Sequence, residues 1–552
     1  MAQLQKKQKK QIPTTNKNFT DFLGDQALNS MYFNKITSTA VLKLINELAI
    51  DKALGPYSIP TSFLKLIAPT ASTVLAHIFN DCVRNGIYPE CLKKATVKPL
   101  HKKDSNLEVG NYRPISLLSN INKIFEKLLH YRLVRFFEDN NTITTNQFGF
   151  RKGHSTNHAV IALTELVRKA LDTGQFAAGI FIDLKKAFDT VEHDILLHKL
   201  EHYGIRGPAL EILRSYLTKR SQCVEIRNSF SKYVPVRHGV PQGSVLGPLL
   251  FIIYINDLHL SLENSTTIHF ADDTSLICCD KSLKKLNRKV NRDLALLVHW
   301  LRANKISLNT SKTELILFRS TRNIVTKNLN FRLSGQKIHP QPKVTYLGII
   351  LDEHLSWDPH VHDLTTKLSR TVGFLSKLRH LVDFKTLLSI YYALFDSHVS
   401  YCLQTIGYIT QASLEKIEVL QNKALRIMHF KPPREPARPL YIKSAILPLR
   451  KLLMVKNCLL ALDFVKRTIP SYFCLDFLSR TPNQEATRQS SLRLEPPSTK
   501  TVRYGSFSIA TLVTKDWNNL HSKLKINDLS KISKPTFKSH LHRYILTKLA
   551  EQ

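Results

Sequence analysis

Phe270-Ala271-Asp272-Asp273 is the stretch that decides the fold of this chain. It lies between two short runs rich in β-forming residues, Thr267-Ile268-His269 and Thr274-Ser275-Leu276-Ile277-Cys278-Cys279. Such runs on either side of a polar pair predict a β-hairpin with both aspartates at the turn. Two adjacent carboxylates repel each other, so a fold that places them together needs a cation to balance their charge. An Asp-Asp turn on a solvated surface is the competing interpretation of this stretch alone.

An acidic residue further upstream favours the cation-binding interpretation. Asp183 ends the apolar run Ala177-Ala178-Gly179-Ile180-Phe181-Ile182, which has the pattern of a strand buried on both faces. An ionised aspartate at the end of such a strand is costly unless it is paired or bound to a metal. Two neighbouring strands that each offer a carboxylate at the tip would form a site for two Mg²⁺ ions bridged by substrate phosphates.

Several motifs that follow one another along the chain carry a family resemblance. They are Phe181-Ile182-Asp183 with Ala187-Phe188-Asp189, then Pro241-Gln242-Gly243-Ser244, then Phe270-Ala271-Asp272-Asp273. In this order and spacing they resemble the palm motifs of a reverse transcriptase encoded by a non-LTR (LINE-like, CR1/jockey-like) retrotransposon. The resemblance implies an α+β right-hand polymerase with fingers, palm and thumb and a helical C-terminal extension. It also implies an RNA-directed DNA polymerase that extends a primer 3′-hydroxyl with dNTPs by a two-metal mechanism.

The resemblance assigns the catalytic and metal-binding residues. Mg²⁺ is the expected cofactor, as two ions, with Mn²⁺ as the alternative ion. Asp273 is expected to act as a supporting carboxylate. Lys312, in the motif Ser307 to Thr313, would lie near the pyrophosphate leaving group as a general acid, and an exposed turn lysine is the alternative. The expected catalytic residues are Asp183, Asp272, Asp273 and Lys312, and the expected metal-binding residues are Asp183, Leu184 and Asp272.

Nucleotide contacts are expected from the fingers and from the loops beside the aspartates. Two short strands joined by a basic loop describe the fingers hairpin, although an exposed basic hairpin without this role is the alternative. A lysine of that loop would contact the triphosphate as a point charge, and an arginine would grip it with a planar fork. The bulky ring of Phe188 would exclude a ribose 2′-hydroxyl from the nucleotide site. This argues against the alternative of an RNA polymerase built on the same palm. The residues in these roles are Lys102, Lys103, Arg113, Phe188 and Gln242.

Template and primer contacts are expected from two further loops. The loop from Gln147 to Thr156 places Arg151 and Lys152 between aromatic residues and glycines, which suits contact with a template backbone. The run from Val344 to Leu351 resembles the primer grip, a hairpin at the junction of palm and thumb. Its expected contact residues are Tyr346, Leu347 and Gly348.

Composition and charge favour a nucleic-acid partner. The 552 residues are 43% hydrophobic, which is typical of a globular protein. Lysine and arginine exceed aspartate and glutamate by 79 to 43, giving a formal net charge of +36. Self-repulsion on this scale favours binding to a polyanion. The basic residues are spread over the whole chain, and no run of about 18 apolar residues occurs, so a membrane is not expected.

The chain divides into five expected regions. Apolar spacing predicts an amphipathic helix from Ile36 to Ile50, a buried helix from Leu246 to Leu260 and a helix behind the sheet from Lys284 to Ala303. The regions are a basic, disordered tail at 1–35, fingers with an N-terminal extension at 36–175, a palm at 176–355, a helical thumb at 356–430, and a C-terminal extension of unassigned role at 431–552.

The expected partners are an RNA template, a DNA primer or target, and dNTPs. Eight cysteines without a CxxC pair argue against a disulfide framework and a zinc ribbon, so we expect an intracellular protein in a reducing compartment. We expect it in the nucleus, and in the cytoplasm as a ribonucleoprotein before import. Relatives carry an endonuclease ahead of the polymerase, whereas about 35 residues precede the first helix here, so a separate endonuclease or a pre-existing nick is expected. A catalytically dead, nucleic-acid-binding relic is the alternative function.

Overall fold

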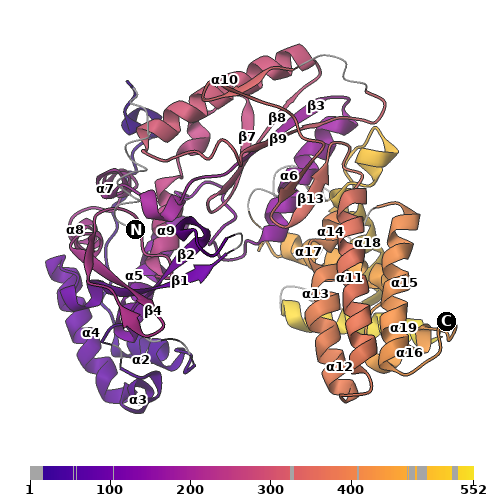
Figure 1. Cartoon of the computed structure of the whole chain (residues 1–552), viewed down its shortest axis with the longest axis horizontal. Coiled ribbons are helices and arrows are strands. Elements are labelled where there is room, and N and C mark those ends of the chain that lie inside the picture. Colours follow the sequence, from indigo (N-terminus) through magenta and orange to yellow (C-terminus); the bar gives the residue numbers. More distant parts are fainter. Residues whose placement is uncertain are drawn as a thin grey trace, which may run out of the picture.

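The chain forms two arms that extend from a shared region of helices and strands (Figure 1). The computed structural model describes residues 16–551 apart from 52, 54, 58, 103–104, 324–328, 407–408, 469, 471–478, 481–493 and 525–531. The mixture of helices and separate sheets agrees with the expected α+β class. Within the described residues, no helix is both long and apolar enough to cross a membrane.

A four-stranded antiparallel sheet carries both aspartate motifs. Its order is β7-β8-β3-β9, and its strands are β3 (Phe176–Ile182), β7 (Ser265–Phe270), β8 (Asp273–Asp280) and β9 (Glu314–Phe318). β3 and β8 pair in the register that sets Ile182 opposite Thr274. All but the first residue of β3 are buried, which confirms the predicted strand ending at Asp183.

Helices cover both faces of this sheet. Successive residues of a strand point to opposite faces. On one face, Ile180 and Ile182 pack in a core formed with α9 (Leu246–Tyr254) and α10 (Leu283–Ala303). On the other, Phe181 packs in a core that includes α6 (Thr156–Asp172) and the C-terminal helices. The helix predicted behind the sheet is therefore confirmed, whereas the buried helix predicted from Leu246 to Leu260 ends at Tyr254.

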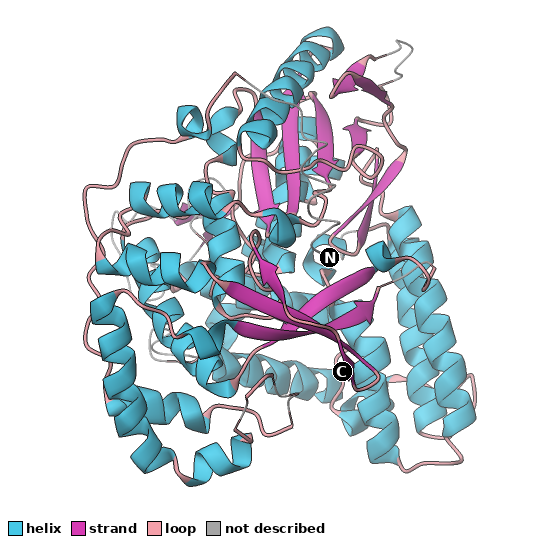
Figure 2. Cartoon of the chain, turned by 60° about the vertical axis from the view of Figure 1, so that its left-hand side comes forward, coloured by secondary structure: helices cyan, strands magenta, loops and turns pink. Residues whose placement is uncertain are grey.

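The N-terminal arm contains a second sheet, which Figure 2 shows as a separate group of strands surrounded by helices. Its order is β2-β1-β4-β5, with β6 beside β4. The predicted hairpin is β1 and β2, which pair antiparallel with Leu100 opposite Arg113. The strands are β1 (Lys94–His101), β2 (Tyr112–Leu117), β4 (Arg220–Ile226), β5 (Ser229–Phe230) and β6 (Val234–Val236). The helices are α2 (Ser38–Asn46), α3 (Thr61–Leu66), α4 (Ala68–Asn85), α5 (Asn120–Asp139), α7 (His193–His202) and α8 (Pro208–Leu217).

The folded region begins earlier than the sequence predicted. Thr37 caps α2, because its Oγ1 accepts a hydrogen bond from the Ala40 amide at 3.2 Å, so the helix expected from Ile36 starts at Ser38. Phe22 and Met31 are buried in the same core as α2. The prediction of a disordered tail through residue 35 is therefore wrong for these two residues, since their apolar side chains gain by burial. Residues 1–15 lie outside the described part of the chain.

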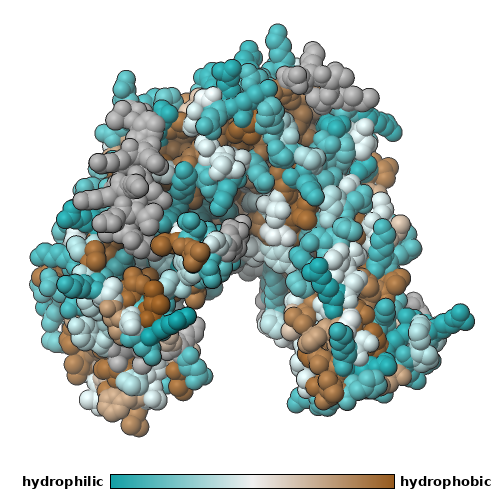
Figure 3. All heavy atoms as spheres, in the orientation of Figure 1, coloured by the Kyte–Doolittle hydropathy of each residue, from teal (hydrophilic) through white to brown (hydrophobic). Residues whose placement is uncertain are grey.

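The C-terminal arm is mostly helical and faces the N-terminal arm across an open gap. The gap remains when all heavy atoms are drawn as spheres (Figure 3). Four strands precede this arm in the chain, namely β10 (Phe331–Leu333), β11 (Gln336–Ile338), β12 (Lys343–Tyr346) and β13 (Ile349–Asp352). Two short strands lie between its helices α17 and α18, namely β14 (Ser479–Arg480) and β15 (Leu494–Glu495). The helices are α11 (Asp358–Leu378), α12 (Phe384–Ile390), α13 (Ser397–Ser400), α14 (Leu403–Ile406), α15 (Gln411–Met428), α16 (Arg438–Ser444), α17 (Leu449–Val465), α18 (Ile509–Leu520) and α19 (Lys534–Glu551).

Described residues after 431 complete the core of this arm. Trp517 of α18 and Phe537 of α19 are fully buried in the core that contains Phe181 of β3. Asp172, at the end of α6, accepts hydrogen bonds from the backbone amides of Lys500 at 3.0 Å and Thr501 at 2.7 Å. The described residues of the segment that the sequence left without a role thus share the core of this arm and are bound to the end of α6.

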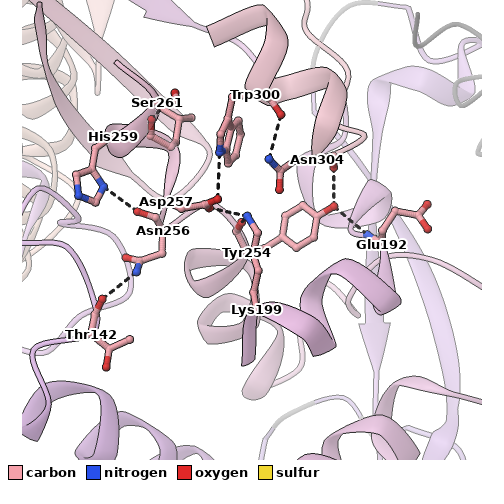
Figure 4. A network of polar contacts seen from close by, with 11 residues as sticks. Thr142, Glu192, Lys199, Tyr254, Asn256, Asp257, His259, Ser261, Trp300 and Asn304 are labelled. Carbon is pink, nitrogen blue, oxygen red and sulfur yellow. Dashed lines mark hydrogen bonds and ion pairs between the residues drawn. The ribbon is translucent and has the colours of Figure 1, made fainter. Parts of the chain in front are cut away.

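A buried ion pair joins α7 to the segment after α9 (Figure 4). Lys199 Nζ lies 2.5 Å from Asp257 Oδ1, and both side chains are completely buried. Lys199 Nζ also donates to the Tyr254 carbonyl at 2.7 Å, and Trp300 Nε1 donates to Asp257 Oδ2 at 3.2 Å. Burial lowers the pKa of Lys199, and the Asp257 carboxylate acts in the opposite direction. Each charge of the pair therefore has partners within the chain.

Candidate active site

The predicted aspartate hairpin is present at one end of the central sheet. Phe270 of β7 pairs with Asp273 of β8, so Ala271 and Asp272 form a two-residue turn. Ala271 has a φ of 57°, at the first turn position, where such hairpins favour glycine. Asp272 lies in the turn and Asp273 begins β8, and both residues are accessible to solvent, although the surrounding chain partly desolvates their carboxyl groups.

Asp183 follows the last residue of β3 and lies beside this turn. Its backbone carbonyl accepts a hydrogen bond from the Asn309 amide at 2.9 Å. Its Oδ2 accepts a second one from Asn309 Nδ2 at 2.6 Å. Asn309 therefore fixes the orientation of this carboxylate. Sequence reasoning considered Lys312 in the same motif and overlooked Asn309, since only the fold shows which side chain faces Asp183.

Electrostatic coupling joins the three carboxylates to two basic residues of the N-terminal arm. Burial, followed by the charge of Asp183, raises the pKa of Asp272. Burial and the charges of Asp272 and Asp183 raise the pKa of Asp273 to about 6. Lys102 and Arg113 act on the pKa of both residues in the opposite direction. The structure thus brings Lys102 and Arg113, both exposed, to the aspartates, whereas Lys103 lies outside the described residues.

The residues present suit a divalent cation that is shared with a substrate. The described part of the chain holds no group of three or more His, Cys, Asp and Glu side chains that could form a complete metal cage. Mg²⁺ is usually bound by one or two carboxylates together with water and substrate phosphates, which matches Asp183 and Asp272 on neighbouring strands. Leu184 has only its backbone carbonyl to offer. Leu184 and Leu308 form a β-bridge whose hydrogen bonds involve the Asp183 carbonyl and the Lys185 amide. These bonds do not use the Leu184 carbonyl.

Gln147 supports the aspartate turn from behind, a role that sequence reasoning missed. This side chain is 1% exposed, and its Oε1 accepts hydrogen bonds from the Ala271 amide at 3.1 Å and the Gly149 amide at 2.8 Å. A Cβ on Gly149 would lie 2.3 Å from the Ala271 nitrogen, so this close approach requires glycine. The loop expected to contact template therefore also holds the left-handed residue that precedes Asp272.

Gln242 links the loop after β6 to the N-terminal sheet and to the short helical turn Ala187–Thr190 that follows β3. Its carbonyl accepts a hydrogen bond from the Ser116 amide of β2 at 2.7 Å. Its Nε2 donates to Asp189 Oδ1 at 3.1 Å. Burial raises the pKa of Asp189, while Lys186 and the Gln242 hydrogen bond oppose that shift. Asp189 is a second polar residue of the quoted motifs to which sequence reasoning gave no role.

Phe188 lies half-buried between two aromatic rings. It stacks on Phe251 of α9 with ring centroids 4.5 Å apart and meets the edge of Phe150 at 6.2 Å. Phe251 is fully buried, whereas Phe150 is exposed. One side of the Phe188 ring is thus anchored in the core. Its effect on sugar selection stays a prediction.

Arg151, expected to contact template, forms an ion pair within the chain, and its contact with template stays a prediction. Its guanidinium forms a two-point ion pair with Glu138 at 3.0 and 2.7 Å and donates to the Thr144 carbonyl at 2.9 Å. The Arg151 side chain is only 9% exposed, because these partners draw it under the loop. Lys152 is exposed, and its contact with a template backbone stays a prediction.

The remaining expected residues lie on turns around the sheet. Lys312 is exposed in the turn after Asn309. Leu347 and Gly348, both with positive φ, form the two-residue turn between β12 and β13, and Tyr401 Oη donates to the Leu347 carbonyl at 2.5 Å. Tyr346 is buried against Phe181, with ring centroids 5.2 Å apart, and burial raises its pKa. The hairpin expected from Val344 to Leu351 is therefore confirmed and rests on the strand that leads to Asp183.

Residues 100–351 match the family described as "Reverse transcriptase (RNA-dependent DNA polymerase)". This stretch contains the aspartates, Lys102, Arg113 and Gln242. The chain therefore carries a reverse transcriptase domain, and the resemblance drawn from the palm motifs is confirmed.

Relatives from mobile elements extend the likeness beyond this domain. The chain is 30% identical over 411 residues to the probable RNA-directed DNA polymerase from transposon BS of Drosophila melanogaster, covering 72% of this chain and 45% of the relative. It is 29% identical over 419 residues to the RNA-directed DNA polymerase from mobile element jockey of the same species, covering 74% and 45%. It is 30% identical over 397 residues to the probable polymerase from transposon X-element, covering 70% and 43%. The chain thus spans less than half the length of each of these relatives.

Proposed function

We propose that this chain is the RNA-directed DNA polymerase of a non-LTR retrotransposon, extending a primer 3′-hydroxyl with dNTPs. The observation that carries the proposal is the meeting of three carboxylates with Lys102 and Arg113 at one end of the central sheet. This arrangement lies within the residues that match the reverse transcriptase family. A net negative site with nearby cations suits a metal-bound triphosphate.

The proposal includes a right-hand architecture. Residues 36–175 would be the fingers, 176–355 the palm, 356–430 the thumb, and 431–552 an extension that braces the thumb. The open gap between the two arms supports this division, because a primer–template duplex needs an open channel beside the palm (Figure 3). The formal net charge of +36 supports an RNA template and a DNA primer or target as partners.

The chain's own residues act by binding and orienting the reactants. Two divalent ions, Mg²⁺ or Mn²⁺, would be held by Asp183, Asp272 and the Leu184 carbonyl, and when bound they activate the primer hydroxyl and stabilise the leaving oxygen. Asp273 supports this charge without direct ligation. Asn309 holds the Asp183 carboxylate in place through its 2.6 Å hydrogen bond.

Substrate selection falls to the residues around the aspartates. Lys102 and Arg113 neutralise the triphosphate, and Lys312 donates a proton toward the pyrophosphate leaving group. Gln242 contacts the incoming nucleotide, and the Phe188 ring, anchored on Phe251, excludes a 2′-hydroxyl. The turn at Leu347 and Gly348 positions the primer strand.

Primer extension on poly(rA)–oligo(dT) with Mg²⁺ tests this function. We expect incorporation of dTTP that requires the template, prefers dTTP over UTP and is lost with EDTA. Asp183→Asn should abolish it. Asp280→Asn, the same chemical change at the far end of β8, is the matched control and should leave it intact. Nucleic-acid binding by the wild-type chain without any extension would instead favour the catalytically dead alternative and overturn the proposal.

A further inference from the structure

Helix α10 presents a row of basic side chains on its outer surface. Its apolar residues, among them Leu286, Val290 and Leu294, are buried against the central sheet. Four exposed cations occupy the opposite side of the helix and the residue before its cap, namely Lys281, Lys284, Lys285 and Arg288. Figure 1 places α10 along the top edge of the molecule, whereas the gap between the arms opens at the bottom, and Figure 3 shows hydrophilic side chains along that edge.

This arrangement of charges is unfavourable for the helix itself. Residues four apart on a helix are neighbours, so Lys284 and Arg288 repel each other, as do Arg288 and Arg292. The first turn of α10 contains no acidic residue. Positive charges there oppose the helix dipole, which favours anions at a helix N-terminus. A solvated helix surface normally mixes both signs of charge, and this one does not.

Two acidic residues beside this row form ion pairs with other cations, and one of them, Asp280, also interacts electrostatically with Lys285. Asp280 binds Lys289 at 2.8 Å, and Glu263 binds Arg292 at 2.5 and 2.7 Å. Asp293 is buried and accepts hydrogen bonds from the Asn264 amide and the Ser265 hydroxyl. Among the described residues, no acidic side chain forms an ion pair with any of the four exposed cations of this row.

A neighbouring hairpin extends the same surface. β10 and β11 pack on α10, where the Arg332 amide donates to Asn291 Oδ1 at 2.8 Å and Asn291 Nδ2 donates to the Asn330 carbonyl at 2.8 Å. Arg332 and Lys337 are directly opposite each other on the two strands, and both are exposed. Like charges in this position destabilise a hairpin. This is a further unfavourable pair beside the first row.

We propose that these residues form a second nucleic-acid surface, separate from the polymerase site, which binds a phosphodiester backbone. The outer basic patch consists of Lys281, Lys284, Lys285, Arg288, Arg332 and Lys337. A polyanion would remove the repulsion between these cations and occupy the positive end of the helix. The proposal is independent of the proposed polymerase function, because it concerns binding on a face turned away from the gap between the arms.

The test measures binding to the full chain whose polymerase site is already filled with an unlabelled primer–template. The probes are a fluorescein-labelled single-stranded RNA and a labelled DNA duplex of the same sequence, followed by anisotropy at several salt concentrations. The patch variant carries Lys281→Gln, Lys284→Gln, Lys285→Gln and Arg288→Gln. The matched control removes the same charge from exposed residues of α19, with Lys534→Gln, Lys538→Gln, Arg543→Gln and Lys548→Gln.

We expect the patch variant to bind at least one of the two probes about tenfold or more weakly than the control variant. If the four residues contact four phosphates of a single strand, the slope of log affinity against log salt should become shallower by about 3. If binding of only the RNA probe or only the duplex probe is weakened, that result identifies which nucleic acid supplies the backbone. The thermal midpoint of the patch variant at low salt should equal or exceed that of the wild type, because like charges have been removed.

Equal binding by the patch and control variants would overturn the proposal. The Arg332→Gln and Lys337→Gln double variant tests the patch again from the hairpin, so a folding defect in α10 cannot account for both results. It should also weaken binding, and an unchanged affinity there would remove the hairpin from the patch. Extension of a short primer–template should stay within about twofold of the wild type in the patch variant, since contacts with nucleic acid outside the channel do not enter that reaction.

Discussion

The Lys199–Asp257 pair and the aspartates at the β7–β8 turn are two charged groups that differ in net charge. Lys199 and Asp257 are fully buried, lie 2.5 Å apart and have further partners in Tyr254 and Trp300. At the turn, burial and neighbouring carboxylates raise the pKa of Asp272, and they raise the pKa of Asp273 to about 6. One group is neutral by itself, and the other has an excess of negative charge.

The difference separates charges that serve the fold from charges that serve a ligand. A buried pair with satisfied hydrogen bonds holds α7 against the segment after α9 and needs nothing from outside. Carboxylates gathered at an exposed strand end are destabilising until a cation binds. Removal of one charge should therefore have opposite consequences for stability at the two places.

The largest effect should come from Asp272→Asn, which removes a carboxylate from the unbalanced group. We expect primer extension to fall by about a thousandfold or more, since a metal-binding group is lost. The free energy of unfolding should stay equal or rise, because repulsion from Asp183 and Asp273 is relieved. Single-turnover extension and guanidinium unfolding, measured in parallel, check both parts. Activity above a few per cent of the wild type would be incompatible with a metal-binding role.

The balanced pair should respond in the reverse way. Lys199→Met leaves the Asp257 carboxylate buried without its cation, which should lower the free energy of unfolding by about 3–5 kcal/mol. Lys367→Met, which breaks the exposed pair with Asp363, is the control and should cost about 0–1 kcal/mol. Far-UV circular dichroism during guanidinium unfolding measures both. Similar losses in the two variants would show that burial does not distinguish the pairs.

The sequence predicted the unbalanced group better than the balanced one. Asp183, Asp272 and Asp273 each follow or begin a short β-rich run, so local pattern alone placed them at strand ends. Lys199 and Asp257 lie in segments whose contact depends on how α7 packs beside α9. Local periodicity carries no information about such packing, so this pair was not predicted.

Residues that support the site from behind were missed for a similar reason. Gln147 belongs to a motif that was assigned to template contact. Its side-chain oxygen Oε1 instead accepts a hydrogen bond from the Ala271 amide. Arg151, in the same motif, turns inward to Glu138. The sequence pattern shows that a loop contains polar residues next to glycines. The direction in which each side chain points follows only from the surrounding fold.

Gln147→Met should reduce extension while leaving the aspartates in place. The variant keeps the volume and loses the acceptor for the Ala271 and Gly149 amides, so the strained turn before Asp272 relaxes. We expect kcat to fall about ten- to a hundredfold with a smaller change in KM for dNTP. Gln147→Glu, which keeps the acceptor, should recover part of the kcat.

Gln336→Met, on the exposed edge of β11, is the matched control for this substitution. It should leave both constants unchanged. If Gln147→Met and Gln336→Met extend primers equally well, the support that Gln147 gives to the turn has no part in catalysis.

The smallest effect concerns His269, a neutral side chain of β7 between the turn and the core. It is buried, its Nδ1 lies 3.0 Å from Thr274 Oγ1, and burial lowers its pKa to about 3. The unfolded chain would protonate this ring below about pH 6.5, so between pH 6.5 and 3 the unfolded state binds more protons than the folded state. Stability from this group is therefore complete above pH 6.5 and is lost as pH falls, with a slope of at most about 1.4 kcal/mol per pH unit.

His269→Gln removes that proton while keeping a polar side chain beside Thr274. We expect the free energy of unfolding to depend less steeply on pH between about 4 and 6.5 in the variant than in the wild type. Some slope should remain, because burial also lowers the pKa of His158 and of His360 to about 4. Guanidinium unfolding at several pH values in this window measures the difference. Identical slopes would mean that His269 is protonated to the same extent in the folded and unfolded states. The buried strand β7 would then hold a charge without the kind of partner that Lys199 and Asp257 provide for each other, contrary to the comparison above.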